Sequence, residues 1–176
     1  MINKKRPPRD VIDKENYYMA CALWASTRSK DPDTQVGAKI VSSAGKPLGV
    51  GYNGPPKEIL DSDVDWSRPE KYPFIIHAEK NAIKHSDPMK LIGASIYITG
   101  RPCKNCMIDI VDSGILRVIY FERKCVDESS MLHNQLEWDV VQDIAKKSRL
   151  SLSKFSGNLN WMKDQIWKFE ELGYFD

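Results

Sequence analysis

Hydrophobic positions recur at two different spacings along the chain, and these spacings predict helices and strands in alternation. The first apolar residues fall on one helix face over 13–29, and Asp13 precedes them as an N-cap. Two short runs with β-branched residues, 35–43 and 48–52, flank a turn at 44–47 and predict a hairpin. Further along, the pattern predicts strands over 94–99, 116–121 and 150–155 and helices over 77–86, 103–113, 131–147 and 158–172.

The order of these elements predicts the fold class. Strands and helices alternate after the hairpin, so the fourth and fifth strands can run parallel, in a sheet with helices on both faces. A chain of 176 residues is long enough for one sizeable core. We therefore expect an α/β fold in a single domain over 1–176, with a core of about 13–155 and a C-terminal helix of about 158–172.

One long segment has no periodic pattern. The stretch 53–73 contains four prolines and many polar residues, which predicts a loop. Loops of this length inside a compact domain are usually functional.

Composition and charge argue against nucleic acid and membrane as binding partners. The formal net charge is +2 at pH 7, which argues against a dedicated nucleic-acid binder with a broad basic face. No apolar run approaches the roughly 18 residues needed to span a membrane, and the basic N-terminal residues have no apolar run behind them, as a signal peptide would. The sequence predicts a cytoplasmic protein (in the host cytoplasm, if a phage encodes it) with no membrane or nucleic-acid partner.

Two short segments carry the candidate chemistry. His77-Ala78-Glu79 and Pro102-Cys103-Lys104-Asn105-Cys106 each open a predicted helix. One imidazole and two thiolates suit Zn²⁺ and leave its fourth tetrahedral position open for water. The positive end of a helix dipole stabilises a thiolate at such a position. We expect one zinc ion per chain on these three ligands and no organic cofactor.

Glu79 follows the histidine ligand by two residues and is a candidate proton shuttle. Zinc lowers the pKa of bound water to roughly 7, and a nearby carboxylate can accept and return its proton. His-x-Glu together with Pro-Cys-x-x-Cys is the signature of the zinc deaminases. A CxxC motif alone also occurs in redox sites and in purely structural zinc sites, which are the alternatives here.

The segments around these motifs extend the match. They include Arg28-Ser29-Lys30-Asp31-Pro32, Gln35-Val36-Gly37-Ala38, Gly51-Tyr52-Asn53-Gly54 with Pro56, His77-Ala78-Glu79 with Asn81-Ala82-Ile83, and Ser113-Gly114-Ile115. From Trp24 to about Tyr120 the sequence thus resembles the cytidine and deoxycytidylate deaminase superfamily, the dCMP deaminases most closely. The resemblance implies a three-layer α/β/α sandwich around a five-stranded mixed sheet.

The resemblance also implies the activity and the role of each site residue. Zinc would bind His77, Cys103 and Cys106, and Glu79 would be the general acid and base in hydrolysing dCMP to dUMP and ammonia, which supplies dUMP for thymidylate synthesis. Asn53 would contact the nucleotide sugar. The backbone amides of Ala78 and Cys103 would stabilise the developing oxygen, and a carbonyl near Gly100 would accept the exocyclic amine.

The substrate's 5′-phosphate needs a cation, for which the sequence offers Arg28, Arg101, Arg123 and Lys124. Each of them has the alternative of pairing with a surface carboxylate. Arg101 also departs from the family pattern, which has a small or apolar residue just before Pro-Cys. The long loop after Asn53 favours dCMP deaminases over tRNA adenosine deaminases, which are shorter there.

Regulation and assembly are implied in the same way. Many dCMP deaminases are hexamers, activated by dCTP and inhibited by dTTP, with Mg²⁺ bridging the triphosphate. The segment of that family's effector site matches Gly51, Tyr52, Asn53 and Gly54 here. The alternative is that Asn-Gly only makes a turn after a strand.

Two other functions remain open on the sequence. A deaminase acting on a tRNA or single-stranded DNA base would need a basic groove with exposed aromatic side chains. A zinc-stabilised binding module without turnover would have no use for Glu79 beside an open metal position.

Overall fold

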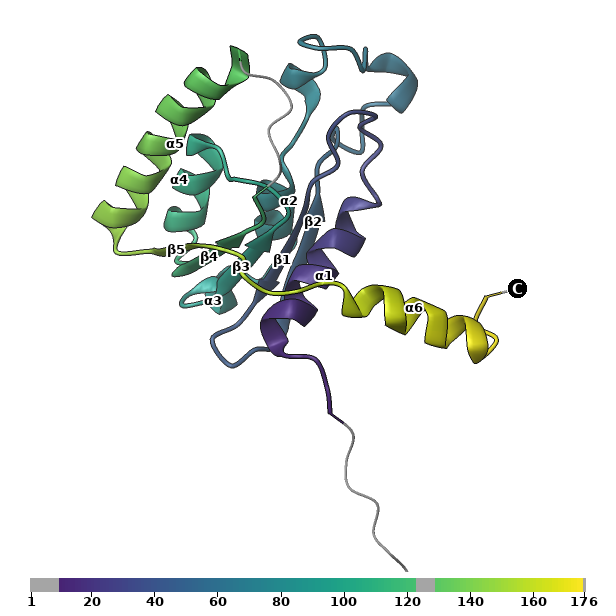
Figure 1. The fold of residues 1–176 in the computed structure, drawn as a ribbon. Coiled ribbons are helices and arrows are strands. Elements are labelled where there is room, and N and C mark those ends of the chain that lie inside the picture. The colour runs from purple at the N-terminus through teal and green to yellow at the C-terminus, as the bar shows by residue number, and fades with distance from the viewer. Residues whose placement is uncertain (1–9, 123–128, 176) are drawn as a thin grey trace, which may run out of the picture.

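Five strands form one mixed sheet in the order β2-β1-β3-β4-β5 (Figure 1). The computed structural model describes residues 10–122 and 129–175, with only the backbone described over 129–134. The strands are β1 (Gly37–Val41), β2 (Pro47–Tyr52), β3 (Ser95–Ile98), β4 (Arg117–Tyr120) and β5 (Ser151–Lys154). β1 pairs antiparallel with both β2 and β3, while β3, β4 and β5 run parallel. The parallel pairing of β4 with β5 confirms the prediction for the fourth and fifth strands.

Helices cover both faces of this sheet, which confirms the α/β/α sandwich. On one face lies α1 (Lys14–Ser26); on the other lie α2 (Ala78–Lys84), α3 (Pro88–Leu91), α4 (Lys104–Asp112) and α5 (Ser129–Ser148). A last helix, α6 (Trp161–Glu171), extends away from the sheet in Figure 1 and has no buried residue. None of the helices in the described parts of the chain combines the length and the apolar character that crossing a membrane requires.

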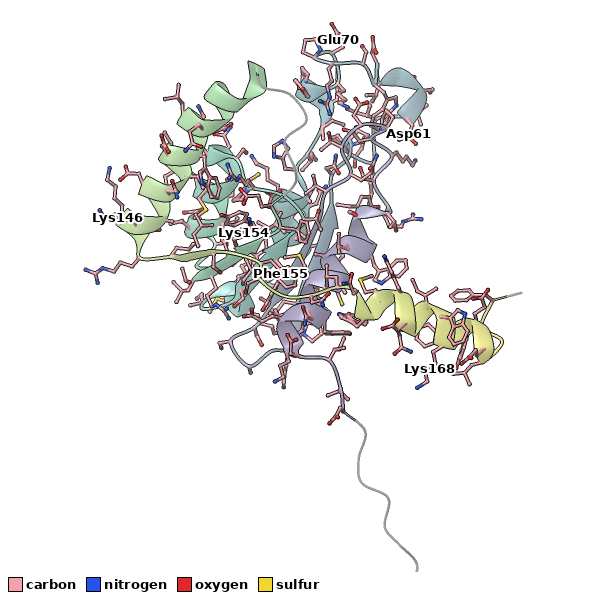
Figure 2. The ribbon with its side chains drawn as sticks, in the orientation of Figure 1. Asp61, Glu70, Lys146, Lys154, Phe155 and Lys168 are labelled. Atoms are coloured by element: carbon pink, nitrogen blue, oxygen red, sulfur yellow. The ribbon has the colours of Figure 1, made fainter. Side chains whose placement is uncertain are left out.

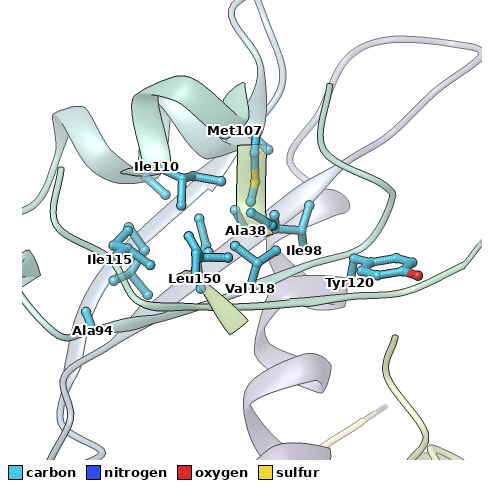
Figure 3. Close-up of a cluster of buried hydrophobic side chains, with 14 of the residues drawn as sticks. Ala38, Ala94, Ile98, Met107, Ile110, Ile115, Val118, Tyr120 and Leu150 are labelled. Carbon is cyan, nitrogen blue, oxygen red and sulfur yellow. The ribbon is translucent and has the colours of Figure 1, made fainter. Parts of the chain in front are cut away.

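Alternation along the strands gives the sheet two apolar faces. Ala38, Ile98 and Val118 point toward α2, α4 and α5, where Met107 and Ile110 pack on them (Figure 3). Neighbouring strand residues point to the opposite face, where Val41, Tyr97 and Ile119 meet Tyr18, Met19 and Ala22 of α1. Burial of the valine, isoleucine and methionine side chains among them, each stabilising by about 1.5–3 kcal/mol, holds the three layers together.

The element boundaries lie within about three residues of the predicted ones. The Asp13 carboxylate accepts a hydrogen bond from the Asn16 amide at 2.9 Å, which confirms the N-cap. However, α1 ends at Ser26 instead of 29, where the hydroxyls of Ser26 and Thr27 donate to carbonyls three residues back. The four-residue helix α3, which starts after the N-cap Asp87, was not predicted because it is too short for a periodic pattern.

Strand directions determine where a site can form. Because β2 and β3 are both antiparallel to β1, the carboxyl ends of β2, β3, β4 and β5 lie at one edge of the sheet. Ligands of open α/β sheets bind outside the carboxyl ends of the strands. The long loop that follows β2 lies beyond this edge and includes two single turns of 3₁₀-helix, Asp61–Asp63 and Tyr72–Phe74 (Figure 1).

Gly51 allows α2 to lie directly on β2. A Cβ atom at this position would come within 2.2 Å of the Ala78 carbonyl oxygen and 2.4 Å of the Ala82 nitrogen. Only glycine permits so close an approach of the two backbones. The first turn of α2, which carries the predicted chemistry, is thereby fixed relative to the sheet.

Candidate active site

Two helix N-termini bring the three predicted metal ligands together. His77 is the N-cap of α2, Cys103 is the N-cap of α4, and Cys106 lies in the first turn of α4. The Nδ1 atom of His77 is 3.5 Å from the Sγ atom of Cys103 and 3.2 Å from that of Cys106. Within 10–122 and 129–175, no fourth histidine, cysteine or carboxylate joins this group, whose ligand atoms all lie within 4.8 Å of one another.

The spacing of these ligand atoms fits a tetrahedral zinc ion. With Zn–N near 2.1 Å and Zn–S near 2.3 Å, ligand atoms on a tetrahedron lie about 3.6 Å apart. The two measured N···S distances fall within about half an ångström of that value. The geometry therefore accommodates Zn²⁺ with a fourth position left for water.

The pKa values of the two thiols shift in opposite directions. A hydrogen bond from Cys106, with help from His77 and against the effect of burial, lowers the pKa of Cys103 to about 3. Contact with Cys103 and burial raise the pKa of Cys106. Two sulfur atoms this close do not both ionise unless a cation binds between them, and a divalent metal ion meets that need.

Glu79 lies in the first turn of α2 and is 3% exposed. Burial raises the pKa of its carboxyl, and a hydrogen bond to its own backbone together with the charge of His77 offsets only part of that effect. A carboxyl group whose pKa moves toward neutrality is suited to exchanging protons with a substrate.

A cavity of about 550 Å³ opens over these groups at the carboxyl edge of the sheet. It brings together several residues that the sequence assigned to the substrate. Asn53, Ala78, Gly100 and Arg101 line it along with Glu79 and two of the ligands, His77 and Cys103. Cys106 lies behind this surface and is fully buried.

The Asn53 side chain is 5% exposed and holds the chain segment that precedes β1. Its Oδ1 accepts a hydrogen bond from the Val36 amide at 2.8 Å, and its Nδ2 donates to the Thr34 carbonyl at 2.9 Å. An amide nitrogen has two N–H donors, and one of them is used in this contact. Asn53 is therefore a fixed part of the cavity wall.

The other residues of the predicted effector segment lie outside the cavity lining. Gly51 packs against α2, and the Tyr52 carbonyl accepts a hydrogen bond from Asn81 at 2.8 Å. Gly54 pairs with Ile76 through two backbone hydrogen bonds of 3.1 and 2.9 Å. These contacts join β2, α2 and the end of the long loop.

The four predicted phosphate-binding residues differ in their position relative to the cavity. Arg101 lines the cavity. Arg28 is exposed just after α1 and does not belong to the lining. Arg123 and Lys124 lie outside the residues that the structure describes.

Sequence reasoning missed a charged cluster in the opposite cavity wall. Lys71, 1% exposed, lies 2.7 Å from Asp31, which is 4% exposed, and 2.7 Å from the more exposed Asp33. Arg68 completes the cluster, 3.2 Å from Asp33 and hydrogen-bonded to Thr34 at 2.5 Å. The cluster ties the long loop to the segment before β1, which Asn53 also holds.

Proton equilibria show how tightly the cluster is coupled. Burial alone would raise the pKa of Asp31, but hydrogen bonds from Lys71 and from two backbone amides outweigh it, so the pKa lies below 3.8. Burial would likewise lower the pKa of Lys71, yet its two aspartate partners raise it above 10.5. The pKa of Asp33 is lowered as well, chiefly by its hydrogen bond from Lys71. All three groups are therefore ionised at neutral pH.

Taken together, an open His-Cys-Cys metal group and a buried glutamate at the edge of an α/β/α sandwich define a zinc-dependent hydrolytic deaminase. A family model covers the part of the chain that holds these groups. Residues 12–122 match the family model described as the cytidine and deoxycytidylate deaminase zinc-binding region. The chain belongs to the cytidine and deoxycytidylate deaminase family.

Individual relatives are deoxycytidylate deaminases. The chain is 40% identical to that of Homo sapiens over 130 residues, which cover 70% of this chain and 72% of the relative. It is 39% identical to that of Mus musculus, with 87% of this chain and 84% of the relative covered. Among solved structures, the dCMP deaminase of cyanophage S-TIM5 in its apo form superposes with a TM-score of 0.57 at 26% identity, covering 80% of this chain and 96% of that one.

Proposed function

We propose that the protein hydrolyses dCMP to dUMP and ammonia. The observation that carries this proposal is the buried Glu79 beside the three-ligand metal group, on the wall of a cavity that also holds Asn53. The family gives the reaction type, and the human and mouse relatives, both named deoxycytidylate deaminases, support dCMP as the substrate.

Glu79 and nearby backbone groups would perform the proton transfers. Zinc on His77, Cys103 and Cys106 would supply the Lewis acidity that makes water a nucleophile near neutral pH. Glu79 takes a proton from the water whose oxygen adds to C4 of the cytosine ring, and passes it to N3. Glu79 then helps to protonate the exocyclic amine, which leaves as ammonia. The sum is dCMP plus water giving dUMP plus ammonia.

The other cavity residues would position the substrate. By resemblance, the backbone amides of Ala78 and Cys103, at the start of α2 and at the N-cap of α4, would donate to the oxygen on which negative charge develops. The carbonyl near Gly100 accepts a hydrogen bond from the amine, and the remaining N–H of Asn53 is assigned to the sugar. These roles follow the family resemblance and agree with the cavity lining.

Initial rates on dCMP, CMP, deoxycytidine and dCTP, measured side by side, test the substrate. We expect the highest kcat/KM for dCMP. The same assay with cytosine and adenine in single-stranded DNA and tRNA tests the alternative of a nucleic-acid deaminase. If the protein deaminated bases in the oligonucleotides but not free dCMP, dCMP would not be its substrate.

Regulation by nucleotide triphosphates is a finer part of the proposal. By resemblance, Gly51, Tyr52, Asn53 and Gly54 contribute to a site for dCTP as activator and dTTP as inhibitor, with Mg²⁺ on the triphosphate, in a homohexamer. Saturation curves for dCMP with and without dCTP plus Mg²⁺ test the effect, and light scattering measures the mass of the assembly. If dCTP left the dCMP saturation curve unchanged and dTTP did not inhibit, the proposal that these nucleotides regulate the enzyme would be refuted. The cytoplasmic location and the single domain over 1–176 stay predictions.

A further inference from the structure

Three neighbouring parallel strands each place one charged side chain at the cavity edge of the sheet. Arg101 follows β3 and Glu122 follows β4. Lys154, labelled in Figure 2, is the last residue of β5. Glu122 forms ion pairs with both cations, to Arg101 and, at 2.5 Å, to Lys154. This triad of two cations and one anion has one positive charge in excess.

The guanidinium group of Arg101 is held in place from a second direction. Its central carbon lies 4.6 Å from the centroid of the Trp138 ring. Trp138 is 7% exposed and packs edge-on against Tyr120, with ring centroids 4.9 Å apart. An arginine stacked on a fixed ring loses little freedom when it binds an anion. Its side chain is 39% exposed, so the guanidinium group remains accessible.

The opposite cavity wall offers no comparable excess of charge. Lys71 and Arg68 face Asp31 and Asp33, so two cations meet two carboxylates. Among the cavity-lining lysines and arginines of the described chain, Arg101 alone belongs to a group with surplus positive charge.

We infer that Arg101 binds the 5′-phosphate of the substrate and so makes the enzyme prefer a nucleoside monophosphate to the free nucleoside. Arg101 stands two residues before the metal ligand Cys103, which fixes it relative to the reacting ring. A guanidinium fork matches the geometry of phosphate oxygens. Lys154 continues to neutralise Glu122 when phosphate draws Arg101 away from it. This inference rests on the proposed deamination of dCMP.

Two substrates that differ only in the 5′-phosphate, dCMP and deoxycytidine, distinguish a role of Arg101 in phosphate recognition from a role in supporting the fold. The kcat/KM values for dCMP and for deoxycytidine are measured for the wild type, Arg101→Met, Arg101→Lys and Arg117→Met. The last variant is the matched control, because Arg117 lies at the start of β4, at the other edge of the sheet, in an ion pair of 2.7 Å with Glu15.

We expect Arg101→Met to lower the ratio of the two kcat/KM values, dCMP over deoxycytidine, about 100-fold, the loss of a charge-assisted phosphate contact. Arg101→Lys keeps the charge and should recover part of the ratio, whereas Arg117→Met should leave it unchanged. Calorimetric titration with dUMP and deoxyuridine gives the same comparison without turnover, with weakened dUMP binding expected.

Two results would overturn the inference. An equal loss on both substrates would make Arg101 a support for the fold alone, and an unchanged ratio would leave it without a part in phosphate recognition. Failure of the proposed function is distinguishable from both, because the wild-type protein would then deaminate neither substrate.

Discussion

Glu79 is a glutamate on a short helix, next to an alanine that has no exposed surface and two residues after a metal ligand. The same side chain on the surface would stay ionised and solvated at neutral pH. Burial changes this, because it destabilises the charged form and raises the pKa of the carboxyl. The buried position of Glu79 therefore raises the proton affinity of its carboxylate, which favours taking a proton from water.

Replacing Glu79 by glutamine tests this role. Glutamine keeps the size and the hydrogen-bonding reach of the side chain but cannot carry a proton between water and the ring. We expect kcat on dCMP to fall by at least about 10³-fold, while zinc content and the circular dichroism spectrum stay unchanged. Glu58→Gln, on an exposed loop position, is the control. A Glu79→Gln enzyme with near wild-type turnover would refute the assignment.

At the scale of elements, the site depends on how closely α2 lies on β2. Gly51 and Gly54 belong to the same short segment yet differ sharply in their surroundings. A Cβ at Gly51 would collide with the backbone of α2, whereas a Cβ at Gly54 would meet nothing within 4 Å.

The variants Gly51→Ala and Gly54→Ala therefore test whether the close packing of α2 on β2 matters for stability and turnover. We expect Gly51→Ala to lower the free energy of unfolding by about 1–3 kcal/mol and to reduce turnover, since α2 must shift with His77 and Glu79. Gly54→Ala should leave both within error in the absence of effectors. Urea unfolding and steady-state rates measure this, and equal stability of the two variants would contradict the account of the packing.

The buried Lys71 and its aspartate partners form the cavity wall opposite Arg101. Removing one member of this charged cluster should lower the free energy of unfolding. Lys71→Met leaves the buried Asp31 without its cation, which is expected to destabilise the protein by about 3–5 kcal/mol. The control is Lys30→Met, in an exposed pair with Asp61, which should cost about 1 kcal/mol or less. Chemical denaturation gives the free energy of unfolding of both variants. Similar small decreases in the two would show that the buried pair does not hold the loop.

The same cluster predicts a dependence of stability on pH. The folded pKa of Asp31 lies below the unfolded value of 3.8, so its contribution is complete above that value and is lost as the pH falls through the folded pKa. We expect the difference in unfolding free energy between wild type and Asp31→Asn to stay constant between about pH 5 and 9 and to shrink toward pH 3. A difference that instead grew on acidification would reverse the sign and contradict the pairing.

For the whole molecule, the sequence predicted those features that follow from local patterns. Strand and helix spacing indicated the sandwich and the parallel strands, and the residue types at 77–79 and 103–106 indicated the metal group. Both are properties of short segments, so no knowledge of the packing was needed.

The features that the sequence did not predict depend on distant contacts. Lys71 and Asp31 are 40 residues apart, and a lysine in a polar loop looks solvated until the fold buries it. Arg28 was a phosphate candidate because it belongs to a matched segment; it is exposed after α1 and does not belong to the cavity lining. Arg101 became the stronger candidate only when β4 and β5 placed Glu122 and Lys154 beside it.

The central claim is that three side chains hold one zinc ion and leave its fourth position to water beside Glu79. A crystal structure of the zinc-loaded protein, with anomalous data at the zinc edge, tests this most directly. We predict one strong peak per chain, about 2.1 Å from Nδ1 of His77 and about 2.3 Å from the Sγ atoms of Cys103 and Cys106, with a solvent oxygen as the fourth ligand. A zinc ion enclosed by four protein ligands, with no solvent bound to it, would contradict the account.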